Sequence, residues 1–226
     1  MADDQSRRGV TYDSPEIRAY LEGLFCPQDP AFADALAALD RAGMPRIQVA
    51  PNDGRILEVL LALVGARRVV EFGTLSGYSA LWILRALGPE GHLWTCEIDP
   101  KHAEVAREVF ERAGVADRVS LLVGPGEASL EQLAPHAPFD AVFLDADKVG
   151  YPRYARWAFD HLRPGGLLLA DNTYLFGYLA GRTPDAHWNA AAIAAMRAFH
   201  EFLAAHFLAV CLPTPDGLSV GIKPAK

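Results

Sequence analysis

The chain has 226 residues, of which 51% are hydrophobic and 22% charged, and its formal net charge is −7. These values are typical of one globular α/β domain and exclude an intrinsically disordered chain. The acidic balance gives no general attraction for nucleic acid or for an anionic membrane surface.

Membrane and secretory signals are absent from the sequence pattern. No apolar run is long enough to cross a bilayer, and the first ten residues, MADDQSRRGV, lack the apolar segment of a signal peptide. The three cysteines, Cys26, Cys96 and Cys211, are odd in number and widely spaced, which favours reduced thiols. We therefore expect one cytoplasmic domain over residues 1–226, with neither a membrane nor a nucleic acid as its partner.

The first 66 residues predict helices. Ser14-Pro15 and Pro30 each begin an apolar-periodic stretch, and a third helix covers 52–66 with Asn52 or Asp53 as its cap. We expect these helices to decorate an α/β core that occupies residues 67–226.

From residue 67 onward, short apolar runs alternate with amphipathic stretches. The runs predict strands at 67–72, 92–99, 118–123, 139–146 and 165–172, followed after a helix at 190–207 by strands at 207–213 and 218–224. Such alternation is typical of βαβ units, while Asp216-Gly217 signals a hairpin between the last two strands. We predict a doubly wound, mostly parallel seven-stranded sheet with helices on both faces and an antiparallel last strand.

A glycine-rich turn follows the first predicted strand, in EFGTLSGYS. Gly73 and Gly77 flank the turn, and the free N–H groups of the next helix can meet a polar ligand. The spacing differs from G-x-G-x-x-G, which disfavours an NAD-dependent dehydrogenase. Glu97 lies about 20 positions past Gly77, the spacing at which an acid meets a ribose hydroxyl in nucleotide-binding α/β folds. A nucleoside without a pyrophosphate is indicated.

S-adenosylmethionine (SAM) fits that description. Its ribose suits Glu97, and its amino-acid end can meet Glu71, the Gly73 backbone and Ser79. Glu127, after the third strand, either meets the adenine or is a first-turn acid favoured by the helix dipole.

Oxygen-bearing side chains end the fourth and fifth predicted strands. Asp145 ends one strand and Asp171-Asn172 the other, so the three can converge at one rim of the sheet. Oxygen ligands suit Mg²⁺, Ca²⁺ or Mn²⁺, and the remaining coordination positions suit a chelating vicinal diol. Lys148 could accept the hydroxyl proton, since a nearby cation favours a neutral lysine amine. The plainer readings are an N-cap at Asp145 and an Asx turn at Asp171-Asn172.

Several motifs occur together in one order. EFGTLSGYS, CEID, AGVADRV, FDAVFLDADK, RPGGLLLADN and LPTPDGL resemble the cation-dependent O-methyltransferases, which include the catechol and caffeoyl-coenzyme A O-methyltransferases. The resemblance runs from residue 47 to the end. It implies metal-dependent methyl transfer from SAM to a hydroxyl of a small catechol-like phenol, by a homodimer.

The resemblance also implies roles for single residues. It implies Lys148 and Asp145 as catalytic residues and Asp145, Asp171 and Asn172 as ligands of a divalent cation, Mg²⁺ before Ca²⁺ or Mn²⁺. The implied cofactor contacts are Val49, Glu71, Gly73, Gly77, Tyr78, Ser79, Glu97, Ile98, Gly126, Glu127 and Asp145. Asp147 is predicted to be a structural helix-start residue.

Substrate selection is expected in the segment 173–189. Its aromatic residues either line a substrate pocket or pack the segment onto the sheet, and they are Tyr174, Phe176, Tyr178 and Trp188. The chain has no match for the late glutamate with which animal catechol enzymes hold the second hydroxyl. Two other functions stay open: methylation of a hydroxylated uridine in transfer RNA, and SAM binding without turnover.

Overall fold

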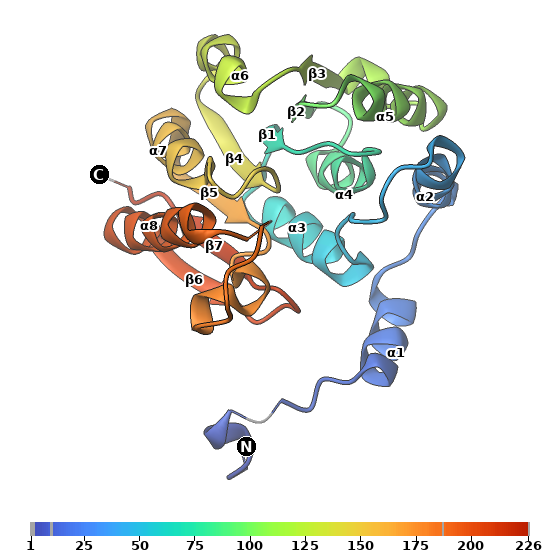
Figure 1. The fold of residues 1–226 in the computed structure, drawn as a ribbon. Coiled ribbons are helices and arrows are strands. Elements are labelled where there is room, and N and C mark those ends of the chain that lie inside the picture. The colour runs from blue at the N-terminus through green and yellow to red at the C-terminus, as the bar shows by residue number, and fades with distance from the viewer. Residues whose placement is uncertain (1–2, 10, 187, 226) are drawn as a thin grey trace.

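The computed structural model describes residues 3–9, 11–186 and 188–225, and its centre is one seven-stranded sheet (Figure 1). The strand order is β3-β2-β1-β4-β5-β7-β6. The strands are β1 (Arg68–Phe72), β2 (His92–Glu97), β3 (Val119–Val123), β4 (Phe139–Leu144), β5 (Leu162–Ala170), β6 (Leu208–Leu212) and β7 (Leu218–Ile222). β1 to β5 run parallel, and β7 is antiparallel to both β5 and β6. The predicted fold class is confirmed.

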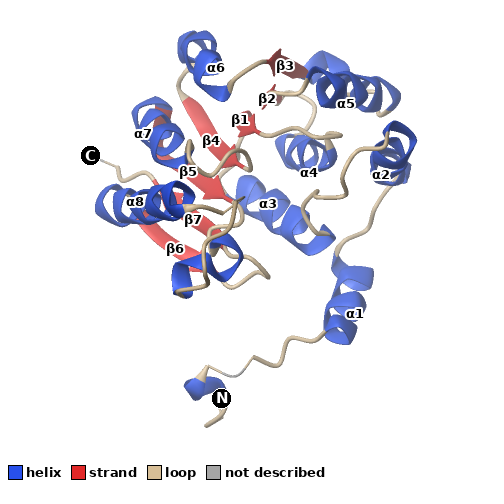
Figure 2. Ribbon diagram, in the orientation of Figure 1, coloured by secondary structure: helices blue, strands red, loops and turns tan. Residues whose placement is uncertain are grey.

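Helices cover both faces of this sheet (Figure 2). They are α1 (Pro15–Phe25), α2 (Pro30–Ala42), α3 (Pro51–Leu63), α4 (Tyr78–Leu87), α5 (Pro100–Arg112), α6 (Gly126–Leu133), α7 (Tyr151–His161) and α8 (Ala190–His206). One buried cluster joins α2, α3, α4 and α5 to the sheet, and the other joins α6, α7 and α8 to it. Short 3₁₀ turns include η4 (Leu175–Ala180). The described part of the chain contains no helix long and apolar enough to cross a membrane.

Two local predictions were wrong. Neither Asn52 nor Asp53 caps α3, because the helix already begins at Pro51, whose fixed φ and missing N–H suit the first helical position. β5 begins at Leu162 rather than at residue 165, since an irregular register between Phe139 and Ala141 of β4 accommodates the Pro-Gly-Gly segment.

β1 and β4 are parallel neighbours at the middle of the sheet. The order in which successive strands are added reverses between them. Ligands of open α/β sheets bind at such a switch point. The loops after the two strands meet there: the Asp145 N–H donates to the Phe72 carbonyl at 2.8 Å. A Cβ on Gly73, whose φ is +101°, would lie 2.0 Å from the Asp145 carbonyl oxygen. Glycine is therefore required for the two loops to approach.

Candidate active site

A cavity of about 650 Å³ opens at this switch point. Ten of the predicted site residues line it: Val49, Gly73, Tyr78, Ser79, Glu97, Ile98, Gly126, Asp145, Lys148 and Asn172. Four others are not part of the lining: Glu71, Gly77, Glu127 and Asp171. The fold thus brings the glycine turn and the ends of β2, β4 and β5 to one cavity.

Glu97 is buried at the end of β2 and faces the glycine turn. Its Oε2 accepts hydrogen bonds from the backbone N–H groups of Thr74 (3.1 Å) and Leu75 (2.8 Å). Its Oε1 lies 3.6 Å from Nδ1 of His102, which also lines the cavity. Sequence reasoning missed His102, since a single histidine in the first turn of a helix carries no motif. The predicted contact between Glu97 and a ribose stays a prediction.

Glu71 lies behind the cavity wall, fully buried in β1. Its two carboxyl oxygens are hydrogen-bonded to the hydroxyls of Ser79 and Thr95, both at 2.7 Å. Burial is the main cause that raises the pKa of Glu71, to about 8. Glu71 therefore holds Ser79, which does line the cavity, and is largely neutral at pH 7.

The raised pKa of Glu71 predicts a pH-dependent stability difference for Glu71→Gln. In the folded state the carboxyl keeps its proton up to about pH 8, while in the unfolded state it ionises above its ordinary value of 4.5. Stability therefore falls as pH rises between these values, by on the order of 3 kcal/mol at pH 7. Glutamine carries no such proton, so the SAM-free variant should match the wild type near pH 5 and melt at a higher temperature at pH 8.

Thermal melts from pH 5 to pH 9 measure this difference. The exposed Glu90→Gln is the matched control, and because it keeps Glu71 its melting temperature should follow that of the wild type across the range. A melting-temperature gap for Glu71→Gln that stays constant across the range would contradict the burial argument.

Lys148 is buried at the rim of the cavity, 7% exposed. Its Nζ donates to Asp145 Oδ1 at 3.3 Å and to the Tyr151 hydroxyl at 2.6 Å. That hydroxyl also reaches the carbonyl oxygens of Leu144 (3.0 Å) and Asp171 (2.9 Å), so it joins the ends of β4 and β5. Tyr151 was not among the predicted site residues, although its position three residues after Lys148 was a signal in the sequence.

Asp171 and Asn172 follow β5 beside Asp145. Burial, and then the charge of Asp145, raise the pKa of Asp171 to about 7. Asn172 has a φ of 54°, a left-handed conformation that L residues rarely adopt. Among the described residues, no group of three or more His, Cys, Asp or Glu side chains could hold a metal ion. The predicted ligand set has only two carboxylates, with the Asn172 amide as its third oxygen.

Asp147, Glu127 and Gly77 each make contacts outside the proposed chemistry. Asp147 accepts hydrogen bonds from the Gly150 N–H (2.7 Å) and the Tyr154 hydroxyl (2.8 Å) just before α7, and these bonds fit the predicted structural role. Asp147 also lines the cavity, which that prediction did not include. Glu127 is exposed and pairs with Arg153, so its placement suits the first-turn reading better than an adenine contact.

Close packing explains why residue 77 is glycine. A Cβ at this position would lie 2.5 Å from the Phe110 ring, and the φ of Gly77 is +84°. Glycine is therefore needed both for the turn and for the close approach of α5.

The aromatic residues of 173–189 divide between the two readings. Phe176 and Trp188 line the cavity with their ring centroids 4.9 Å apart. Tyr178 is buried and bonds Asp185, and the Tyr174 ring packs over Gly217. Phe176 and Trp188 thus form one side of the cavity, which we call the aromatic wall. Tyr178 and Tyr174 instead pack the segment 173–189 against the rest of the protein.

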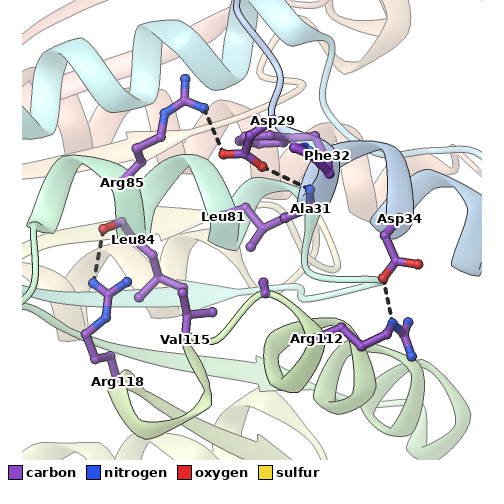
Figure 3. A pocket seen from close by; sticks show the side chains of 12 residues that line it. Asp29, Ala31, Phe32, Asp34, Leu81, Leu84, Arg85, Arg112, Val115 and Arg118 are labelled. Carbon is purple, nitrogen blue, oxygen red and sulfur yellow. Dashed lines mark hydrogen bonds and ion pairs between the residues drawn. The ribbon is translucent and has the colours of Figure 1, made fainter.

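A second cavity, of about 460 Å³, lies between α2, α4 and the segment after α5 (Figure 3). Its charged groups are already engaged: Arg85 with Asp29, Arg112 with Asp34, and Arg118 with a carbonyl of α4. Its lining comes from α2, α4 and the segment from the end of α5 to β3, and it includes no residue at the carboxyl end of a strand. The first cavity is therefore the candidate active site.

Comparisons with known proteins identify a family for the chain. The O-methyltransferase family model matches residues 31–223. A catechol O-methyltransferase of Mycobacterium tuberculosis is 45% identical over 172 residues, 76% of this chain and 78% of that protein. A catechol O-methyltransferase of Niastella koreensis is 40% identical over 189 residues, 83% of this chain and 84% of that protein.

Solved structures share the fold as well. The O-methyltransferase from Bacillus cereus in complex with SAH has a TM-score of 0.85 and 32% identity, covering 92% of this chain and 97% of that one. Family match, identity and fold all point the same way: this chain belongs to the O-methyltransferase family.

Proposed function

We propose that the protein transfers the methyl group of SAM to one hydroxyl of a small catechol-like substrate, with a divalent cation holding the substrate oxygens. The observation that carries the proposal is the meeting of Lys148, Asp145 and Asn172 with the glycine turn at one cavity. Two relatives at 45% and 40% identity are named catechol O-methyltransferases, and a structural neighbour is in complex with SAH.

The residues present fit a hard cation. Asp145 and Asp171 lie close enough for the charge of one to raise the pKa of the other, and a cation between them would relieve this repulsion. Asp145, Asp171 and Asn172 would hold it, with Mg²⁺ as first choice. When bound, it would supply Lewis-acid polarisation of the phenolic oxygens.

The chain's own residues would carry the remaining steps. Glu97, Ser79 and the Gly73 backbone would orient SAM, while the aromatic wall would place the ring of the substrate. Lys148 Nζ, held by Tyr151 and Asp145, would take the hydroxyl proton. The phenolic oxygen then bonds the methyl carbon as the bond from that carbon to the sulfonium sulfur breaks, leaving S-adenosylhomocysteine.

A homodimer and a cytoplasmic location complete the proposal. Helix α1 lies outside the α/β core and buries none of its residues (Figure 1). Its exposed apolar side chains suit an interface with a second copy of the chain: Ile17, Tyr20, Leu21, Leu24 and Phe25. All three cysteines are free, which fits a reducing compartment.

Methyl transfer from labelled SAM to a panel of catechols and other vicinal phenols tests the proposal. Transfer should require Mg²⁺, stop with a chelator, and return when Mg²⁺ is restored. Transfer that persists in chelator would contradict the cation. No transfer to any phenol, despite SAM binding, would contradict the substrate class and favour transfer RNA or binding without turnover.

A further inference from the structure

The turn between β6 and β7 is fastened to the segment that follows β5. The Thr173 N–H donates to the Gly217 carbonyl at 3.0 Å, and the Tyr174 N–H donates to the Asp216 carbonyl at 2.9 Å. The Thr173 hydroxyl adds a bond of 3.1 Å to the Gly217 carbonyl. The hairpin turn, far from residue 173 in sequence, is therefore fixed to the segment that carries Phe176, which lines the cavity.

Asp216 in this turn uses only one of its two carboxylate oxygens. Oδ1 accepts a hydrogen bond from the Phe176 N–H at 2.8 Å. Oδ2 is buried and has no hydrogen-bond partner in the described part of the chain. Burying a carboxylate oxygen without a hydrogen-bond partner costs free energy. We therefore expect a function that needs this oxygen.

The surroundings of Asp216 indicate where that oxygen is needed. Burial raises the pKa of Asp216, while the Phe176 amide, the Lys148 charge and the Asn172 side chain lower it. The bonds from Thr173 and Tyr174 to the turn place Asp216 next to the segment that begins with Asn172, and its bond to the Phe176 N–H places it behind the aromatic wall. Asp216 does not line the cavity itself.

Phe176 needs an anchor of this kind. Its φ is 51°, and so is the φ of Leu175, a left-handed conformation that side chains other than glycine rarely adopt. Phe176 is also 41% exposed, so core packing alone does not hold it. The bond from its N–H to Asp216 fixes the backbone that carries the ring, and with it the contact to Trp188.

We propose that Asp216 is a positioning residue for methyl transfer: Oδ1 anchors the aromatic wall through Phe176, and Oδ2 receives the Asn172 amide so that the oxygen of Asn172 faces the cation. The second half rests on the proposed function, whereas the first concerns the shape of the cavity alone. Partners of this kind commonly orient metal ligands.

Two substitutions separate the two halves. Asp216→Ala removes both oxygens, so the segment after β5 should loosen and trypsin should cut at the exposed Arg182 about tenfold faster. The KM for a catechol should rise about tenfold. Asp216→Asn keeps an oxygen for the Phe176 N–H, so it should restore wild-type proteolysis and, at saturating Mg²⁺, the wild-type KM.

Asp216→Asn should instead weaken cation binding. Its new amide would donate to the Asn172 oxygen, and the Kd for Mn²⁺, measured by titration without substrate, should rise about tenfold. The control is Thr214→Val in the same turn, because the Thr214 hydroxyl is buried without a partner and its loss removes no bond. This variant should behave as the wild type in all three measurements, and SAM binding should be unchanged in every variant.

Each half can fail by itself. Wild-type cleavage at Arg182 and an unchanged KM in Asp216→Ala would overturn the anchor. Unchanged Mn²⁺ binding in Asp216→Asn would overturn the orientation of Asn172. If the wild-type protein methylates no phenol, the proposed function is wrong. The proteolysis comparison would still test whether Asp216 anchors the backbone of Phe176.

Discussion

Asp145→Ala is expected to abolish methyl transfer while SAM binding largely survives. The backbone of Asp145 is held by the Phe72 carbonyl and packs against Gly73, so alanine should leave the loop in place. The side chain is the proposed cation ligand and the partner of Lys148 at 3.3 Å. Losing several kcal/mol of charge stabilisation lowers the rate by at least about 10³-fold.

Turnover with a catechol and calorimetric SAM binding measure the two effects separately. Asp160→Ala, which removes one exposed acid of α7, should keep wild-type activity and serves as the control. Retained turnover in Asp145→Ala would rule out the cation mechanism, and a parallel loss of SAM binding would instead indicate a cofactor residue.

Lys148→Met is expected to lower kcat by about 10²–10⁴-fold, the range for loss of a positioned acid–base group. Methionine keeps an unbranched side chain in this buried position but removes the bonds to Asp145 and Tyr151. If Lys148 takes the proton, the deficit should shrink for a nitro-substituted catechol, whose hydroxyl ionises more readily. The kcat ratio of wild type to variant for the two substrates is the measurement.

The exposed Lys101→Met controls for the loss of one positive charge and should leave kcat unchanged. An equal deficit with both catechols would mean that Lys148 acts by position or charge rather than by accepting a proton. An unchanged kcat in Lys148→Met would mean that Lys148 has no part in the mechanism.

Both predictions concern residues that the sequence alone indicated. Strands of a parallel sheet read as apolar runs, and their carboxyl ends meet at one edge. The polar residues that follow the runs were therefore predicted to share a rim, and they are Asp145, Asp171 and Asn172. Asp145 and Asn172 line the same cavity, whereas Asp171 is not part of its lining. Gly73 was predicted likewise, because a turn between a strand and a helix must admit a ligand.

Other features depended on contacts between distant segments. Tyr151 is the first residue of α7, and only the fold brings its hydroxyl, which also bonds Lys148, to the ends of β4 and β5. Asp216 looked like a hairpin residue, but the antiparallel pairing of β7 with β5 carries it to Phe176.

Burial decided the rest. Glu71 and Glu97 are both acids at the ends of neighbouring strands, but only Glu97 lines the cavity, while Glu71 is enclosed by Ser79 and Thr95. Local periodicity determines which segments are strands and which residues end them. Which side chains face the cavity, and which lie behind its wall, follows from long-range packing that no local pattern encodes.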